Sequence, residues 1–383
     1  MLYDVAVCGC DDYSYDNCAS AVRAAFDAVG GGEFIYPGCR VVIKANLVSA
    51  LKPEKAATTH PALLCALSDL LYEKGASVVI GDSPGGVYSQ PFMSRVYSAT
   101  RMTDTEAHHA SLNHDFGVTE AIYEKGVTAK RFKYTSYLDN ADVMINFCKL
   151  KTHGMMGMSA GVKNMFGVIP GTMKPEYHYK YPDPDDFVSM LIDLNEYFHP
   201  ALTFCDAVEC MEGNGPTAGK PRHMGAVIAS RSQYKLDAVC AKLIGMDPLT
   251  VRTVTGSIKR GLLDGDLSSI CVFGDISEFA VTDFDTSVVS KNSLFDSSNM
   301  NFGGKIKGKI IKFFVSSKPA PHKAECIGCK KCFEICPAKA ISMKNNKPQI
   351  DRGKCIKCFC CQEFCPVGAM KVKRTFVARL LQK

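Results

Sequence analysis

The sequence predicts an α/β fold, with a mostly parallel sheet and flanking helices, joined to a small α+β module at the C-terminus. Between residues 4 and 277, short apolar runs alternate with amphipathic segments, which is the pattern of an α/β domain. Beyond residue 319, cysteines recur at short and regular spacings. We therefore expect an α/β domain over residues 1–290, a linker over 291–318, a cysteine-rich domain over 319–375 and a tail over 376–383.

The apolar runs have the length of strands, and helices are expected between them. The predicted strands cover residues 4–8, 41–45, 77–80, 143–147, 202–207, 225–229 and 270–273. Apolar residues at helical spacing predict helices over residues 60–74, 186–197 and 236–244. Because helices between strands imply parallel pairing, the loops at the carboxyl ends of the strands are the expected site.

The composition is that of an ordinary folded protein, with 46% hydrophobic and 22% charged residues. The formal charge of +6 is small and dispersed except over residues 305–318, which argues against a nucleic-acid surface. No run approaches the roughly 18 apolar residues of a membrane span, and the first ten residues do not resemble a signal peptide. We expect a cytoplasmic protein with no nucleic-acid partner and no membrane span.

Eight of the 19 cysteines form two copies of one pattern, 29 positions apart. Each copy reads Cys-x2-Cys-x2-Cys-x3-Cys-Pro. Thiolates at every third position wrap three corners of an iron-sulfur cube, and the other copy supplies the fourth thiolate, as in bacterial two-cluster ferredoxins. The pattern predicts a ferredoxin-like domain with two 4Fe-4S clusters, one held by Cys326, Cys329, Cys332 and Cys365 and the other by Cys355, Cys358, Cys361 and Cys336.

Structural zinc is the competing interpretation of these cysteines. Zinc needs only four thiolates in two Cys-x2-Cys pairs, so it explains neither the third cysteine nor the Cys-Pro ending of each copy. A long chain without a secretion signal also favours thiolate ligands over disulfides. Cys360 lies inside the second copy but off the pattern, as a bystander, a substitute ligand or a redox-sensitive thiol.

The most unusual segment of the large domain covers residues 149–167 and follows the predicted strand that ends at Phe147. Its glycines would permit close approach of the backbone to a ligand. Lys151, His153, Lys163 and Asn164 would hold a carboxylate or phosphate there. The alternative is a solvated glycine-rich loop. The segment lacks the nucleotide-binding glycine patterns, so it predicts neither NAD nor ATP.

A second segment, residues 206–216, follows another predicted strand and contains Asp206, Glu209 and Glu212 with two glycines. We expect a tight turn whose carboxylates bind a hard cation or act as a general base. Ordinary turn chemistry explains the same residues, because Gly, Asn and Pro form turns regardless of function.

Two more strand ends carry polar groups, namely Lys44 with Asn46 and the segment 81–86 with Asp82. If the sheet is parallel, these ends and the two segments above meet at one edge, forming a pocket with Lys, Asn, His and carboxylate groups. Lys174 and His178 lie in a segment that would cap this pocket or form an exposed loop. The apolar-basic stretch 305–314 is expected to be a connector, with a membrane-surface helix as the alternative.

The polar strand ends and the cysteine repeat together resemble the family called domain of unknown function 362. The matching motifs are Lys44-Ala-Asn46-Leu, Gly81-Asp82-Ser-Pro, Lys149-x-Lys-Thr-His153, Val162-Lys163-Asn164 with Gly167, and Glu212-Gly-Asn-Gly-Pro216. The resemblance spans nearly the whole chain, and it implies a cytoplasmic iron-sulfur protein with an appended two-cluster ferredoxin module. It implies no particular reaction.

Our leading hypothesis is an oxidoreductase in which the clusters deliver single electrons to an anionic substrate or cofactor in the α/β domain. Lys151, His153, Lys163 and Asn164 would orient the substrate, with His153 also supplying protons. Asp206, Glu209 or Glu212 would hold a metal or act as a base. The range of cluster potentials, about −700 to +450 mV, leaves the direction open, although we expect substrate reduction.

Two other functions fit the same sequence. A non-catalytic electron carrier or assembly factor would use the large domain to dock a partner protein, whereas the leading hypothesis requires a small-molecule substrate. A redox sensor would use Cys360. Neither the oligomeric state nor a further cofactor of the large domain follows from the sequence.

Overall fold

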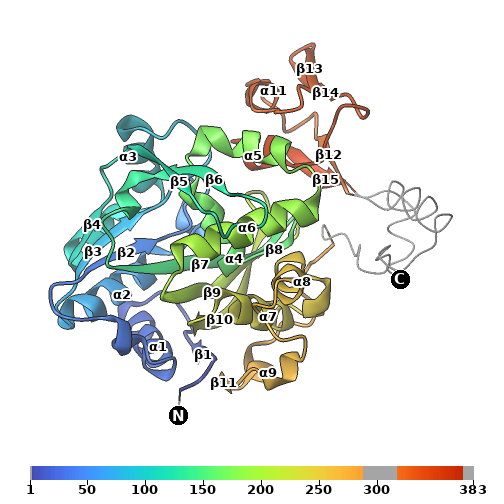
Figure 1. The fold of residues 1–383 in the computed structure, drawn as a ribbon. Helices are drawn as coiled ribbons and strands as arrows, with labels where there is room; N and C mark the ends of the chain where they lie inside the picture. The colour runs from blue at the N-terminus through green and yellow to red at the C-terminus, as the bar shows by residue number, and fades with distance from the viewer. Residues whose placement is uncertain (1, 288–316, 374–383) are drawn as a thin grey trace.

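The computed structural model describes residues 2–287 and 317–373 (Figure 1). The predicted tail at 376–383 and the stretch 305–314 lie outside the described residues, as does all of the predicted linker except its last two positions. Within the described part of the chain, no helix is long and apolar enough to cross a membrane.

A nine-stranded sheet forms the centre of the large domain, with the order β11-β1-β10-β9-β7-β2-β3-β4 and with β8 paired to β7. Its strands are β1 (Val5–Gly9), β2 (Arg40–Lys44), β3 (Ser77–Gly81), β4 (Ala110–Leu112), β7 (Val143–His153), β8 (Gly157–Ser159), β9 (Leu202–Glu212), β10 (Lys220–Ser230) and β11 (Val272–Phe273). A separate hairpin consists of β5 (Val118–Ile122) and β6 (Arg131–Thr135).

Five strand pairs of this sheet are parallel: β1 with β11, β2 with β3, β2 with β7, β3 with β4 and β7 with β9. The mostly parallel sheet is therefore confirmed. The expectation of parallel pairing was wrong for β10, which is antiparallel to both β1 and β9. The physical reason is the short connection, residues 213–219, from β9 to β10, because a parallel pair needs a crossover of a dozen or more residues.

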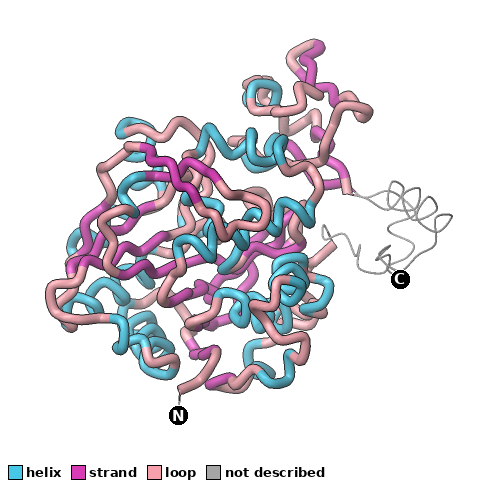
Figure 2. Tube along the Cα trace, in the orientation of Figure 1, coloured by secondary structure: helices cyan, strands magenta, loops and turns pink. Residues whose placement is uncertain are grey.

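Helices cover both faces of the sheet, as Figure 2 shows. The helices are α1 (Tyr15–Ala28), α2 (Pro61–Glu73), α3 (Gln90–Ala99), α4 (Gly161–Asn164), α5 (Lys174–Lys180), α6 (Pro184–Phe198), α7 (Gln233–Leu243), α8 (Arg252–Lys259) and α9 (Ile276–Phe279). Side chains of α1, α2 and α3 pack on one face of the sheet, and those of α6, α7 and α8 on the other. In β2, Val41 and Ile43 contact the first layer and Val42 the second, because successive side chains of a strand point to opposite faces.

The cysteine-rich domain is small and projects from the large domain (Figure 1). Its elements are β12 (Lys318–Pro321), α11 (Lys331–Glu334), β13 (Ile341–Lys344), β14 (Lys347–Ile350), α12 (Cys360–Glu363) and β15 (Met370–Lys373). The antiparallel pair β12–β15 lies toward the large domain, and the hairpin β13–β14 forms the outer tip. The predicted small ferredoxin-like α+β domain is therefore present.

Candidate functional site

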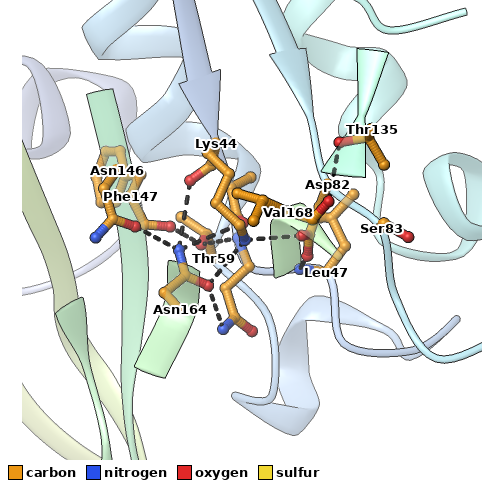
Figure 3. A network of polar contacts seen from close by, with 12 residues as sticks. Lys44, Leu47, Thr59, Asp82, Ser83, Thr135, Asn146, Phe147, Asn164 and Val168 are labelled. Carbon is orange, nitrogen blue, oxygen red and sulfur yellow. Dashed lines mark hydrogen bonds and ion pairs between the residues drawn. The ribbon is translucent and has the colours of Figure 1, made fainter. Parts of the chain in front are cut away.

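A buried ion pair lies where β2 and β3 end side by side. Lys44 is the last residue of β2, and Asp82 follows directly on β3. The Lys44 Nζ atom lies 2.7 Å from Asp82 Oδ1, and Asp82 Oδ2 accepts a hydrogen bond from the Leu47 backbone at 2.7 Å (Figure 3). Burial lowers the pKa of Lys44, and the Asp82 carboxylate opposes that shift. The pair forms the floor of the candidate site.

Side-chain amides connect this floor to β7. The Asn164 Oδ1 atom accepts hydrogen bonds from Lys44 Nζ at 3.1 Å and from Asn46 Nδ2 at 2.8 Å. Asn164 Nδ2 donates to Asn146 Oδ1 at 2.7 Å. Lys151 Nζ donates to Asn46 Oδ1 at 2.9 Å and to the Ala57 carbonyl at 2.6 Å. The amides therefore fix the positions of two lysines from different strands.

Two further lysines, Lys163 and Lys174, lie around this network, and the surroundings of their ammonium groups differ. Lys174 Nζ donates to the carbonyls of Ser83 and Ile169. Lys163 is buried, and its ammonium lies 4.8 Å from the centre of the Phe166 ring. Among the described residues, the Lys163 ammonium has no hydrogen-bond or ion-pair partner. Burial lowers the pKa of Lys163, and it lowers the pKa values of Lys151 and Lys174 to about 7.

The cysteine-rich domain contributes a carboxylate to the same place. His153, the last residue of β7, is buried, and its Nε2 atom lies 3.1 Å from Glu363 Oε1. Its Nδ1 atom accepts hydrogen bonds from the backbone N–H groups of Met155 and Met156, both at 3.2 Å. The proton of the neutral ring is therefore on Nε2, which donates to Glu363.

Other hydrogen bonds hold the two domains together around this contact. Gln362 Nε2 donates to the Gly215 carbonyl at 2.9 Å, and the Val372 backbone N–H donates to Asn214 Oδ1 at 2.9 Å. A Cβ atom on Gly85 would contact the Phe364 ring, so glycine is needed for this close approach. The cysteine-rich domain is thus docked against the site.

These groups line one cavity, which we call the junction cavity. Its volume is about 60 Å³, enough for about four to six water molecules or a small anion. Its polar and charged lining residues are Lys44, Asn46, Asp82, Ser83, Lys151, His153, Ser159, Lys163, Asn164, Lys174 and Glu363. Four lysines face two carboxylates, so the lining carries excess positive charge when the lysines are protonated.

The repeated cysteines line two separate cavities in the small domain. Cys326, Cys329, Cys332 and Cys365 line the first, and Cys336, Cys355, Cys358 and Cys361 line the second, together with Cys360. Among the described residues, no three His, Cys, Asp or Glu side chains are placed to hold a single metal ion. In a four-iron cube each thiolate binds a different iron, so the grouping of four cysteines around each cavity fits a cluster.

Residues 41–242, more than half of the chain, match the family model described as Domain of unknown function (DUF362). The chain belongs to the DUF362 family. Residues 325–369 match the model of a 4Fe-4S dicluster domain, so the DUF362 domain is followed by a ferredoxin domain that binds iron-sulfur clusters.

Individual proteins that resemble this chain have low sequence identity to it. The thylakoid-associated protein sll1697 of Synechocystis is 29% identical over 270 residues, which cover 68% of this chain and 81% of the relative. The lactate racemase apoprotein from Thermoanaerobacterium thermosaccharolyticum matches at 11% identity and a TM-score of 0.40, covering 63% of this chain and 56% of its own. A protein from Thermotoga maritima matches at 10% identity and a TM-score of 0.32, covering 57% and 55%. The chain thus spans just over half the length of these two structures.

Four of the six site residues expected in the DUF362 domain, Lys151, His153, Lys163 and Asn164, line the junction cavity. We expected the segment that carries them to be a loop, but it is not. Strand β7 continues to His153 and pairs with β8, and the chain then leads into α4. The polar residues that alternate along β7 made the sequence resemble a loop, but in the structure they are buried because they face the site. Lys174 also lines the cavity, whereas His178 is buried beside it and stacks on Phe187 at 4.3 Å.

The carboxylates of residues 206–212 do not lie in a tight turn, because these residues belong to β9. Asp206 forms a buried ion pair with Lys149 at 2.7 Å. Glu209 lies 2.7 Å from His223. Glu212 accepts a hydrogen bond from the backbone of residue 285 at 3.0 Å. The three side chains have separate partners, and neither Asp206 nor Glu212 lines the junction cavity.

Sequence reasoning missed Glu363 and Phe364, which line the junction cavity from the ferredoxin domain. A difference between the two copies of the repeat could have indicated that the second copy is buried there. Lys330 and Lys331 of the first copy correspond to Phe359 and Cys360 of the second, 29 positions later. Such a loss of charge indicates a buried surface on the second copy only.

Proposed function

We propose that the protein is an oxidoreductase that exchanges single electrons with a small anionic substrate or cofactor in the junction cavity. One observation carries the proposal. Glu363 and Phe364 lie in the chain between Cys361 and Cys365, and both line the cavity that contains the DUF362 lysines. The chain segment that would ligate both clusters therefore also forms a wall of the substrate site.

Two 4Fe-4S clusters fit the cysteines of the ferredoxin domain. We assign one to the cavity of Cys326, Cys329, Cys332 and Cys365, and the other to the cavity of Cys336, Cys355, Cys358 and Cys361. When bound, the clusters supply single electrons. Cluster thiolates require a reducing compartment, which supports the cytoplasm as the site of action.

The lysines of the junction cavity favour an anion. The Lys163 ammonium is buried without a described hydrogen-bond partner, and an unpaired buried charge is unfavourable. A carboxylate or phosphate would give Lys163 its missing partner and would lie near Lys151 and Lys174. Asn164, held by the Lys44 and Asn46 contacts, would orient the ligand.

Proton supply is available at the same place. Lys151 has a pKa of about 7 because it is buried, so it can donate a proton near neutral pH. His153 holds a proton on Nε2 toward Glu363. A reduction that consumes protons would therefore draw them from these side chains. Asp206 and Glu212 have no part in this proposal, since they lie outside the cavity.

The test compares two lysines that both contact an aromatic ring. Lys163 contacts Phe166 inside the cavity, and Lys180 contacts Tyr181 on the surface. Oxygen-free holo-protein, reduced photochemically, is mixed with oxalate, pyruvate or phosphoenolpyruvate, and reoxidation is followed by visible absorbance. At equal iron content we expect Lys163→Met to slow reoxidation at least about tenfold, by loss of one charged contact, and Lys180→Met to have no effect.

Equal rates in both variants, together with no stabilisation of either by these anions, would remove the junction cavity from the mechanism. Rapid electron transfer to a partner protein that is insensitive to Lys163→Met would instead favour the non-catalytic carrier.

A further inference from the structure

The two halves of the ferredoxin domain present equivalent surfaces. Helix α11 of the first half and α12 of the second are 29 positions apart, as are the cysteines around them. The residues before these helices, Lys330 and Phe359, both have a φ of 63°, so the backbones follow the same path. Any surface on α12 therefore has a counterpart on α11.

The α12 surface is covered by the DUF362 domain. Phe359 is 3% exposed, Cys360 1% and Gln362 0%, and Gln362 donates to the Gly215 carbonyl. This face docks the second half of the ferredoxin domain onto the junction cavity.

The α11 surface faces solvent instead. Lys330, Lys331 and Phe333 occupy the positions equivalent to Phe359, Cys360 and Gln362, and all three are exposed. Phe333 is 48% exposed. A phenylalanine beside two lysines thus lies free where the other half of the repeat has its interface.

The exposed surface continues to the first cysteine cavity. Ile327 is 66% exposed and Val367 42%, and both line the cavity of Cys326, Cys329, Cys332 and Cys365. Cys329 is itself exposed. A protein docked here would lie against the thiolates assigned to the first cluster.

The charge of the ferredoxin domain indicates which kind of protein would dock at this surface. Residues 317–373 contain twelve lysines and arginines against four aspartates and glutamates. Glu325, one of these four, is paired with Lys371 at 2.9 Å. The thiolates and clusters are anionic and reduce this excess without reversing it. The surface around the exposed apolar residues therefore favours a negatively charged protein.

We propose that Ile327, Cys329, Lys330, Lys331, Phe333 and Val367, the α11 face, dock a small acidic one-electron carrier protein. This inference rests on the electron-transfer part of the proposed function. In each encounter the reduced carrier loses one electron and the ferredoxin domain gains one, with no bond made or broken. An apolar centre with a basic rim suits a transient complex, because the lysines steer the encounter and the apolar contact orients it. Electrons thus enter the ferredoxin domain at the α11 face, and the α12 face connects that domain to the junction cavity.

The experiment uses full-length holo-protein and two probes of opposite charge, an acidic plant-type 2Fe-2S ferredoxin and a basic cytochrome c. The variant is Lys330→Glu with Lys331→Glu. The control is Lys242→Glu with Lys259→Glu, which makes the same charge change at two exposed lysines of the DUF362 domain. Iron content and the rate of reduction by dithionite show that the clusters are intact in each protein. Affinity for each probe is measured by calorimetry, and electron transfer by stopped-flow absorbance.

We expect the α11 variant to bind the acidic ferredoxin at least about tenfold more weakly at low salt and to accept its electrons correspondingly more slowly. Its transfer to cytochrome c should become faster. The control should stay within about twofold of wild type, and the wild-type rate with ferredoxin should fall as salt increases.

Equal losses in the α11 and control variants, or salt-independent binding of ferredoxin, would overturn the α11 face as the docking site. Failure of the junction cavity is separate, because it would appear as absent substrate-dependent reoxidation while ferredoxin still reduces the clusters.

Discussion

His153 and Glu363 lie 3.1 Å apart although 210 positions separate them in the chain. The imidazole belongs to the strand that carries Lys151, and the carboxylate belongs to the helix that contains the cluster cysteine Cys361. The contact therefore joins the substrate side of the molecule to the electron-transfer side. Its strength bears on both stability and ligand binding.

Glu363→Gln should lower the free energy of unfolding by about 1 kcal/mol, because His153 Nε2 can still donate to the amide oxygen but the acceptor is no longer charged. It should also strengthen anion binding, since a negative charge leaves the junction cavity. Urea unfolding and anion titration at equal iron content measure both effects. Glu334→Gln is the matched control, because Glu334 is the exposed equivalent 29 positions earlier. The same loss of stability in both variants would show that the His153 contact is not its cause.

Gly167→Ala should destabilise the DUF362 domain. A Cβ atom at this position would overlap the Lys44 ammonium and the Asp82 carboxylate, so the buried ion pair would have to separate. Breaking a buried pair costs about 3–5 kcal/mol. Chemical denaturation of variant and wild type measures the loss. Gly32→Ala is the control, as the nearest atoms to its added Cβ are 3.8 Å away. A Gly167→Ala protein as stable as this control would contradict the assigned contact.

Stability and anion binding should respond to pH in opposite directions. Burial lowers the pKa of Lys151 from 10.5 to about 7, so between these values the unfolded chain binds more protons than the folded one. Folding stability without ligand should therefore rise with pH above about 7. Anion binding needs the protonated ammonium and should weaken over the same interval. Melting curves from pH 6 to 9 with and without phosphate measure both trends, and Lys151→Met should make each of them shallower while the contribution of Lys174, whose pKa is also about 7, remains. An anion-induced stabilisation that persists unchanged at pH 9 would contradict the role of Lys151.

The crossed assignment of cysteines can be tested with two double variants. Cys336→Ser with Cys355→Ser affects one assigned cluster, so about four irons per chain should remain. Cys355→Ser with Cys365→Ser affects both clusters and should reduce iron further. Iron and sulfide analysis of oxygen-free preparations measures the difference. An uncrossed arrangement would reverse the order, and zinc in place of iron in the wild type would contradict the cluster assignment altogether.

Much of the large domain followed from local sequence pattern. The helix predicted over residues 60–74 is α2 (Pro61–Glu73), and the one over 186–197 is α6 (Pro184–Phe198), because apolar residues at helical spacing define the buried face. The predicted meeting of Lys44, Asp82 and Lys151 depended only on parallel strands ending at one edge. The error at β10 came from strands predicted too short, because the predicted strands 202–207 and 225–229 leave residues 208–224 between them, enough for a parallel crossover. In the structure β9 and β10 extend toward each other and leave only residues 213–219.

The burial of polar side chains and their ion pairs could not be predicted from neighbouring residues in the sequence. Lys151 and His153 were assigned to a loop because polar side chains in a strand are buried only when tertiary neighbours satisfy them, as Asn46 and Glu363 do here. Asp206 seemed a free carboxylate in the sequence, yet Lys149 on the adjacent strand pairs with it. Such pairings join positions far apart in the chain.

Local sequence was enough to predict the alternation of strands and helices, the domain order and the cysteine repeat, because each depends on residues close together in the chain. The change from Lys330 and Lys331 to Phe359 and Cys360 already marks the second half of the repeat as the buried one, but only the folded structure shows that Glu363, and not the equivalent Glu334, reaches the junction cavity. The fit of α12 against the surface around Gly215 places it there. Domain docking depends on the summed complementarity of two folded surfaces, and no local pattern in the chain encodes that sum.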